Sequence, residues 1–194
     1  MRRFILFLLL SFSSLSLSGC GYNAIQTNDE AVNAAWGDVE ASYQRRADLI
    51  PSLVETVKGY AAHENETLTA VTEARAKVGQ VKIGADVMND PQAFANFQAA
   101  QGGLSSALSR LMVVAENYPD LKASQSFQDF QHQLEGTENR INVARVRYNQ
   151  AVQVFNTSIR TFPNNLTNNF LLHLPRRESF KAEAGAEKAP SVKF

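Results

Sequence analysis

The single cysteine of this 194-residue chain, Cys20, stands where a thiol could be modified after export. Two arginines precede an apolar run, Phe4–Leu17, and the small residues Ser18 and Gly19 separate that run from Cys20. A short basic start, an apolar core of roughly 15 residues and small residues at its end are typical of a cleaved export signal, because a membrane-spanning helix needs ~20 apolar residues. We therefore expect residues 1–19 to be a signal peptide.

The residues around the cysteine also predict its modification. Leu17-Ser18-Gly19-Cys20 resembles the lipobox of bacterial lipoproteins, in which the thiol is diacylated and the peptide is cut before the cysteine. Three or more acyl chains exceed the two signals that stable membrane anchoring requires. We expect Cys20 to be lipidated and to begin the mature protein, with residues 20–29 as a polar tether. The alternative is an ordinary secretory signal that contains an incidental cysteine.

Other chemistry has little basis in the sequence. Once Cys20 is lipidated no thiol remains as a nucleophile, and the serines lie in no Gly-x-Ser-x-Gly elbow. A di-metal site in a helical bundle needs inward-facing glutamates and Glu-x-x-His pairs, and the three histidines, His63, His132 and His173, form no such pair. We expect no catalytic residue, no metal ion and no cofactor, and hence no enzymatic activity.

The charge balance argues against one class of partner. Nineteen Lys and Arg residues equal nineteen Asp and Glu residues, so the formal net charge is zero at pH 7. A protein that binds nucleic acid through bulk electrostatics carries a basic excess. We therefore expect no nucleic-acid partner. Without the signal, the chain is long enough for one domain with its own core.

Apolar residues repeat every seven positions along three stretches of the chain. The three stripes are Trp36, Tyr43, Ile50 and Val57; Phe97, Leu104, Leu111 and Tyr118; and Phe127, Leu134, Ile141, Tyr148 and Phe155. A seven-residue repeat keeps one apolar face along a helix only if helices wrap around each other at shallow angles. The pattern predicts an all-α chain with bundle packing, and no strand pattern competes with it.

Caps and prolines predict the later helix boundaries. Asp90 can cap a helix that runs from about Pro91 to Asn117, where Tyr118-Pro119 ends it. Ser124 or Ser126 can cap the next helix, which we expect over about 124–160.

The first helical stretch is harder to divide. Its pattern runs over about 28–78, and at 1.5 Å per residue its length of roughly 75 Å is too great for one unsupported helix. We favour a reversal at Asp48–Pro51, because Pro51 removes one backbone donor and Asp48 can cap a new helix. The alternative is a reversal around His63–Thr67.

Several motifs are similar to those of the LemA family. They are Arg45–Tyr60 (RRADLIPSLVETVKGY), Tyr118–Lys122, Glu138–Ile141 with Ala144, Arg145, Tyr148 and Asn149, Phe155-Asn156, Phe162-Pro163, and in the tail Phe180–Glu183 and Pro190–Phe194. The resemblance implies an antiparallel up-and-down four-helix bundle with long helices over residues 30–162, a membrane location and no established biochemical activity. Relatives often carry an uncleaved transmembrane helix at the amino terminus, whereas this chain carries the lipobox.

Polar residues inside these motifs are the candidates for interaction. They are Arg46, Asp48, Glu138, Arg145 and Asn149. One interpretation is that they fix helix register through a polar network at the edge of the bundle. The other is that they line a ligand pocket or a partner surface. We expect Glu138 and Arg145 to belong to a network, and Arg46 and Asp48 to form the interaction surface.

Residues 163–194 are predicted to comprise an apolar segment and a flexible tail. Phe162–Leu174 is apolar apart from several asparagines, and could dock across the end of the bundle or lie in the membrane interface. We favour docking, because the polar side of the segment lacks basic residues. Residues 176–194 are rich in Ala, Glu, Lys and Pro, which predicts a solvated tail.

Taken as a whole, the sequence predicts a membrane-anchored envelope lipoprotein that acts as a non-enzymatic interaction or scaffold module. Its expected partners are the membrane, through the lipid on Cys20, and an envelope protein. The alternative is a ligand-binding or enzymatic bundle with a polar pocket of Arg, Glu and Asn. Gly21 lacks the aspartate that typically signals retention in the inner membrane, so we expect the outer membrane if the host has two.

Overall fold

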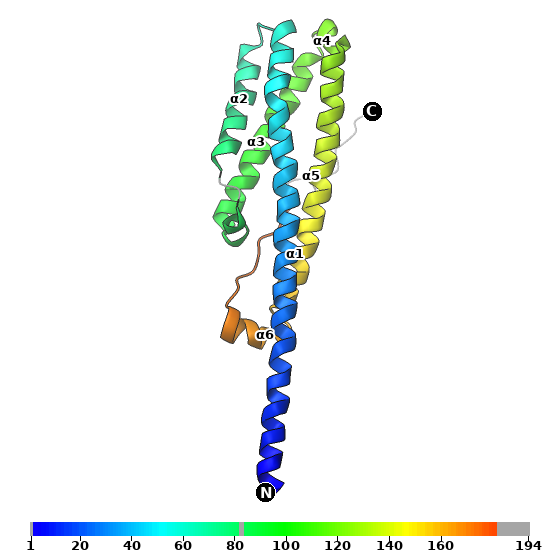
Figure 1. The fold of residues 1–194 in the computed structure, drawn as a ribbon. Helices are drawn as coiled ribbons and strands as arrows, with labels where there is room; N and C mark the ends of the chain where they lie inside the picture. The colour runs from blue at the N-terminus through cyan, green and yellow to red at the C-terminus, as the bar shows by residue number, and fades with distance from the viewer. Residues whose placement is uncertain (1, 82–83, 182–194) are drawn as a thin grey trace, which may run out of the picture.

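The computed structural model describes the backbone of residues 2–81 and 84–181, and the side chains of residues 21–81, 84 and 86–181. The described chain is helical and contains no strand, which confirms the all-α class. Its four long helices are α1 (Arg2–Tyr60), α2 (Asn65–Gln80), α3 (Pro91–Ala115) and α5 (Gln125–Ser158). They lie side by side in an elongated molecule, with α4 at one end; α6 lies beside α1 where α5 ends, and α1 continues past it (Figure 1).

Four short elements connect or extend the long helices. They are the 3-10 helix η1 (Ala85–Asn89), α4 (Pro119–Ala123), α6 (Asn164–Thr167) and the π-helical turn η2 (Asn168–Leu172). Among the described residues, no helix is both long and apolar enough to cross a membrane. The expected signal peptide, residues 1–19, and the side chain of Cys20 lie outside the described side chains.

Two helix starts follow the predicted caps. The side chain of Asp90 accepts a hydrogen bond from the backbone N–H of Gln92 at 2.8 Å, directly before Pro91 opens α3. Ser124 accepts one from the N–H of Phe127 at 3.4 Å, so Ser124 is the cap of α5. Both caps satisfy amide donors that the first turn of a helix leaves without partners.

The reversal that we favoured at Asp48–Pro51 is wrong. Helix α1 continues through Pro51 to Tyr60, and the chain turns over Ala61–Glu64, which overlaps the alternative position around His63–Thr67. Pro51 is exposed at the helix surface, and the side chain of Arg75 in α2 bonds the carbonyl that the proline leaves without a donor. Asp48 caps nothing, because its carboxylate accepts a hydrogen bond from Gln44 one turn earlier in the same helix.

The interior divides into two clusters of buried side chains. The aromatic core is built on Trp36, Tyr43, Phe94, Phe97, Tyr148, Phe155 and Phe180. The aliphatic core is built on Leu49, Ile50, Leu53, Val57, Leu68, Val71, Leu104, Leu108, Leu111, Leu121 and Phe127. The predicted stripes supply most of these residues, and only Tyr118 and Leu134 among the stripe residues are partly exposed. The seven-residue repeat therefore identified the core face of α1, α3 and α5.

The start of the expected tail is held against the helices. Residues 176–181, which we call the C-terminal strap, lie along α5, and Phe180 inserts into the aromatic core with 7% of its surface exposed. The Phe180 ring centroid lies 5.0 Å from that of Phe94 and 5.5 Å from that of Tyr148. This part of the solvated-tail expectation is wrong, because burial of one aromatic ring offsets the cost of ordering a short segment. Residues 182–194 lie outside the described chain.

The expected tether is also ordered. Residues 22–29 belong to α1, and Ile25 is fully buried in the aromatic core. Asp29 forms an ion pair with Arg177 of the strap at 2.7 Å. The expected tether is therefore a packed part of the helical domain.

Candidate functional site

A layer of polar side chains separates the two cores. This polar layer comprises Arg46 of α1, Gln101 and Ser105 of α3, and Glu138 of α5. Arg46 follows the aromatic-core residue Tyr43 on α1 and precedes the aliphatic-core residue Leu49. The polar residues of the three helices thus lie at the same level along the long axis of the molecule.

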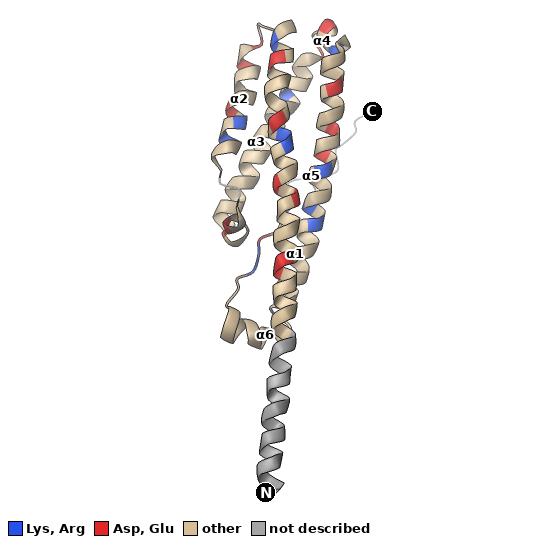
Figure 2. Cartoon of the chain, in the orientation of Figure 1, with Lys and Arg blue, Asp and Glu red and all other residues tan. Residues whose placement is uncertain are grey.

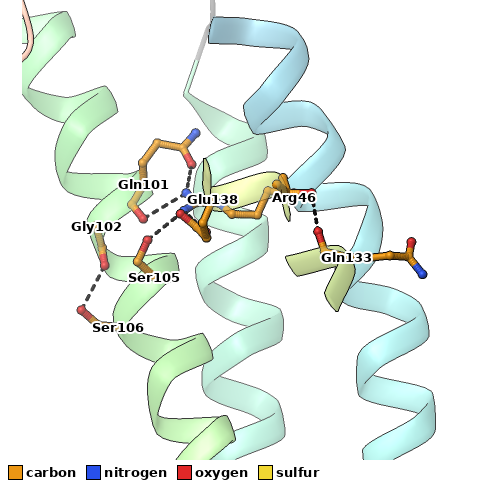
Figure 3. Close-up of polar contacts among 8 residues, drawn as sticks. Arg46, Gln101, Gly102, Ser105, Ser106, Gln133 and Glu138 are labelled. Carbon is orange, nitrogen blue, oxygen red and sulfur yellow. Dashed lines mark hydrogen bonds and ion pairs between the residues drawn. The ribbon is translucent and has the colours of Figure 1, made fainter. Parts of the chain in front are cut away.

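Arg46 is the centre of this layer, and its guanidinium contacts both neighbouring helices (Figure 3). Its Nη1 donates to Ser105 Oγ at 2.8 Å and to Glu138 Oε1 at 3.0 Å. Its Nη2 donates to the side-chain oxygen of Gln101 at 2.5 Å and to the Gln101 carbonyl at 3.2 Å. Arg46 also lies over the Tyr43 ring, 5.0 Å from its centroid.

The burial of the Arg46 guanidinium requires that its charge and its donors have partners. The side chain of Arg46 is 2% exposed, whereas that of Glu138 is 41% exposed. A guanidinium removed from water needs a counter-charge and partners for its donors, otherwise it destabilises the fold. Glu138 supplies the charge, and Gln101 and Ser105 supply further acceptors. A polar layer between apolar cores permits few alternative alignments of the helices, so it specifies their register.

A small cavity adjoins the polar layer. Its volume is about 140 Å³, and Arg46, Gly102, Glu138 and Arg145 are among its lining residues. Arg46 Nε is buried and has no hydrogen-bond partner among the described residues. Burial raises the pKa of the neighbouring Tyr43 phenol, although the positive charges of Arg145 and Arg46 act in the opposite direction. The lining of the cavity therefore combines the positive charges of Arg46, Arg145 and Lys181 with the negative charge of Glu138 and with neutral hydrogen-bonding groups.

Arg145 and Asn149 serve the C-terminal strap instead of the polar layer. The guanidinium of Arg145 lies over the Phe180 ring, 4.7 Å from its centroid, and Nη2 donates to the Lys181 carbonyl at 3.5 Å. Asn149 donates to the Phe180 carbonyl and accepts from the Phe180 N–H, both at 2.9 Å. One asparagine thus pairs with the backbone on both sides of the inserted ring.

Asn156, seven residues further along α5, repeats this pairing. It donates to the Arg177 carbonyl at 3.0 Å and accepts from the Arg177 N–H at 2.9 Å. Arg177 in turn reaches Asp29 of α1. Asn149 and Asn156 therefore both bind the strap to α5.

Arg46 does not form an interaction surface, so that expectation is wrong: its side chain is buried. Asp48 is exposed and takes part in neither the polar layer nor the contacts of the strap. Its side chain bonds Gln44 of the same helix. Gln101, Ser105 and Phe180 also belong to these contacts, although the sequence did not identify them as site residues. A signal existed for Arg46 and Gln101, since each stands at helical spacing inside an apolar stripe, where a polar residue must have a partner.

The described residues contain no group of three or more His, Cys, Asp or Glu side chains that could hold a metal ion. The polar groups of the site instead bind one another: Arg46 joins three helices, and two asparagines hold the strap.

The fold and the site define a class of elongated all-helical domains with a buried polar layer and a strap closed over an aromatic core. The chain belongs to the LemA family, whose family model matches residues 35–194. This confirms the resemblance read from the motifs.

Curated relatives agree with this assignment. The chain is 26% identical over 163 residues to Protein LemA of Metamycoplasma hominis, covering 84% of this chain and 70% of the relative. It is 26% identical over 178 residues to the magnetosome protein MamQ of Magnetospirillum gryphiswaldense, covering 80% of this chain and 65% of the relative. Magnetosome protein MamQ 2 of Paramagnetospirillum magneticum is 25% identical over 182 residues, covering 86% of this chain and 66% of the relative. The chain thus spans about two thirds of the length of the MamQ relatives.

Proposed function

We propose that this LemA-family chain is an envelope lipoprotein, anchored through acyl chains on Cys20, whose helices form an antiparallel four-helix bundle. The bundle acts as a non-enzymatic interaction or scaffold module. Residues 1–19 are the cleaved signal in this proposal, and the outer membrane is the location if the host has two membranes. The lipobox-like sequence Leu17-Ser18-Gly19-Cys20 is the observation that carries the proposal.

The geometry after the cysteine supports an anchor at this position. Gly21 is buried, and a Cβ added there would lie 2.9 Å from Asn164 Oδ1 and 3.1 Å from Thr167 Oγ1 of α6. The domain therefore closes around the residue that follows the proposed lipid. With no long flexible tether, acyl chains on Cys20 hold the α6 end of the domain at the membrane surface.

The polar groups support a scaffold more than a catalyst. Arg46, Gln101, Ser105 and Glu138 bond one another, and Asn149 and Asn156 bond the strap, so these groups already have structural partners. Long helices in fixed register present an extended rigid surface, which suits an envelope protein partner. The exposed motif residue Asp48 is the candidate contact on that surface.

Metabolic labelling with a fatty acid tests the anchor. We expect wild type to incorporate the label, and Cys20→Ala to remain an unlabelled precursor or to be released in soluble form. Ser18→Ala is the matched control, because it keeps a small residue before the cysteine and should be labelled like wild type. Equal label in wild type and Cys20→Ala would contradict lipidation. Crosslinking in intact cells with wild type and Asp48→Ala then tests the partner contact.

The cavity beside Arg46 supports a second candidate function, the binding of a small polar ligand. The unpartnered Arg46 Nε favours an anion, and the lining carries three cationic side chains (Arg46, Arg145 and Lys181) against one carboxylate, Glu138. Thermal melts with inorganic phosphate or acetate test this function, since a ligand that binds only the folded protein raises its melting temperature. The rise should disappear in Gly102→Leu, because open space lies beside Gly102 where the larger side chain would enter the cavity.

A further inference from the structure

The segment after α5 exposes apolar side chains in a group. We call the exposed residues Phe162, Leu166, Phe170 and Leu171 the apolar patch; their exposed fractions are 75%, 46%, 81% and 65%. Single exposed apolar residues are ordinary on soluble proteins, but a contiguous group marks a surface for binding a protein or a membrane.

The backbone behind the apolar patch is held in place. Asn168 is buried and bonds Leu174 in both directions, by donating to its carbonyl at 3.2 Å and accepting from its N–H at 3.0 Å. Leu172 and Leu174 pack against the aromatic core. One side of the segment is thus docked on the helices, while Phe170 and Leu171 face outward.

The apolar patch lies at the end of the domain where the anchor is proposed. Helix α6 packs on α1, and Asn164 and Thr167 lie beside Gly21, the residue after Cys20, so closely that a Cβ added to Gly21 would meet their side chains. Figure 1 shows α6 at the opposite end of the described bundle from α4. A lipid on Cys20 would therefore bring the membrane surface to the apolar patch.

The charge distribution matches a lipid surface. Residues 161–175 contain no Asp, Glu, Lys or Arg, and Figure 2 shows α6 without charged residues while charges are spread over the other helices. Arg160 and Arg176 flank this uncharged segment and line the same surface depression. Apolar side chains buried at the level of the headgroups, with cations beside them, are typical of interfacial membrane contacts.

We propose that the apolar patch inserts into the interface of the membrane that carries the Cys20 lipid, and that Arg160 and Arg176 contact anionic headgroups there. This inference rests on the proposed function for the position of the anchor. A lipid attached at one residue leaves the domain free to rotate about that point. A second contact through the apolar patch fixes the long axis of the helices relative to the membrane.

Depth-dependent quenching tests the inference on the full lipidated protein, reconstituted in phosphatidylcholine vesicles with and without phosphatidylglycerol. In Phe170→Cys the new thiol is the only free one, because Cys20 carries lipid, and it takes an environment-sensitive fluorophore. Val113→Cys on α3, 70% exposed and near α4, is the control at the other end. We expect lipid-borne nitroxides to quench the label at position 170 several-fold more than the label at position 113. Phosphatidylglycerol should increase that difference, and Arg160→Gln with Arg176→Gln should remove the increase.

The outcomes separate the contact from the anchor. If the protein floats with the vesicles but the two labels are quenched equally, the inference is wrong while the anchor stands. A second outcome would show that the apolar patch binds lipid while the proposed anchor is wrong. In that outcome fatty-acid labelling fails and the unlipidated Cys20→Ala protein still binds vesicles. Adding Phe170→Ser and Leu171→Ser to that protein then removes the binding. A protein partner at the patch would show itself as a crosslink at position 170 without nitroxide quenching, which would overturn the inference.

Discussion

The guanidinium of Arg75 donates from Nε to the backbone carbonyl of Ala47 over 3.1 Å. Ala47 lies four residues before Pro51, so its carbonyl is the acceptor that a helical N–H at position 51 would have bonded. A side chain of α2 thus replaces the hydrogen bond that proline removes from α1. This contact also ties α2 to α1.

The first prediction concerns this replacement. We expect Arg75→Ala to lower the free energy of unfolding by about 0.5–1.5 kcal/mol, as for one lost hydrogen bond. In a Pro51→Ala background the same change should cost less, because the restored backbone N–H bonds the Ala47 carbonyl. Chemical denaturation of the four proteins of this double-mutant cycle measures the coupling. Arg110→Ala, an exposed arginine of α3, is the control; equal losses for Arg75→Ala in both backgrounds would show that the two residues act independently.

The second prediction concerns the C-terminal strap. Asn149→Ala removes two hydrogen bonds to the backbone of Phe180 and should lower stability by about 1–3 kcal/mol, since both groups are partly buried. Amide exchange at Phe180 should become faster, because its N–H loses the Asn149 acceptor. Gln150→Ala, one position further on the exposed side, should change neither quantity. Unaltered exchange in Asn149→Ala would mean that the aromatic core alone holds the strap.

The third prediction separates register from recognition in the polar layer. Glu138→Ala leaves the buried Arg46 guanidinium without its carboxylate and should cost about 1.5–3 kcal/mol. Glu138→Gln keeps an acceptor and should cost less. Exposed Glu135→Ala should stay within about 0.5 kcal/mol of wild type. Thermal melts and in-cell crosslinking on the same variants decide the role: normal melting with lost crosslinks in Glu138→Ala would make this layer a recognition site.

The fourth prediction concerns alkaline stability. Burial raises the pKa of the Tyr148 phenol well above its ordinary value, and its hydroxyl donates to the Glu178 carbonyl at 2.7 Å. The unfolded chain loses that proton near pH ~10, whereas the folded chain retains it, so the unfolded state binds fewer protons above this pH. Stability should therefore be complete below pH ~10 and fall as pH rises, by about 1.4 kcal/mol per pH unit for each such group.

Tyr148→Phe tests the assignment of that slope. The variant should be less stable at neutral pH, because it loses the bond to Glu178, but its stability should fall less steeply above pH ~10. The remaining dependence comes from Tyr43, whose pKa burial also raises, and from Tyr118, whose pKa is raised by its hydrogen bond to Glu64. Denaturation at a series of alkaline pH values measures both slopes, and identical slopes would exclude Tyr148 as the titrating group.

The sequence by itself determined the all-α class, the starts of α3 and α5, and the buried faces of α1, α3 and α5. Seven-residue spacing of Trp36, Tyr43 and Ile50 puts these side chains on one face of a helix, and a helix with such a face must bury it. Capping is equally local: Asp90 and Ser124 bond amides within three residues, so their roles follow from neighbouring sequence. The motifs also identified the LemA family.

Tertiary structure decided what depends on residues far apart in the chain. Pro51 continues a helix because Arg75 supplies a donor from α2, and local rules for proline contain no such partner. Arg46 is buried because Gln101, Ser105 and Glu138 meet at its height, and no single helix reveals that meeting. Phe180 is buried, unlike the solvated tail that we expected, because α1, α3 and α5 together form a space that its ring fills. The periodicity of apolar residues shows which face of a helix is buried. The residue that pairs with a buried charge, bonds a free carbonyl or fills a space in the core is set by packing between helices.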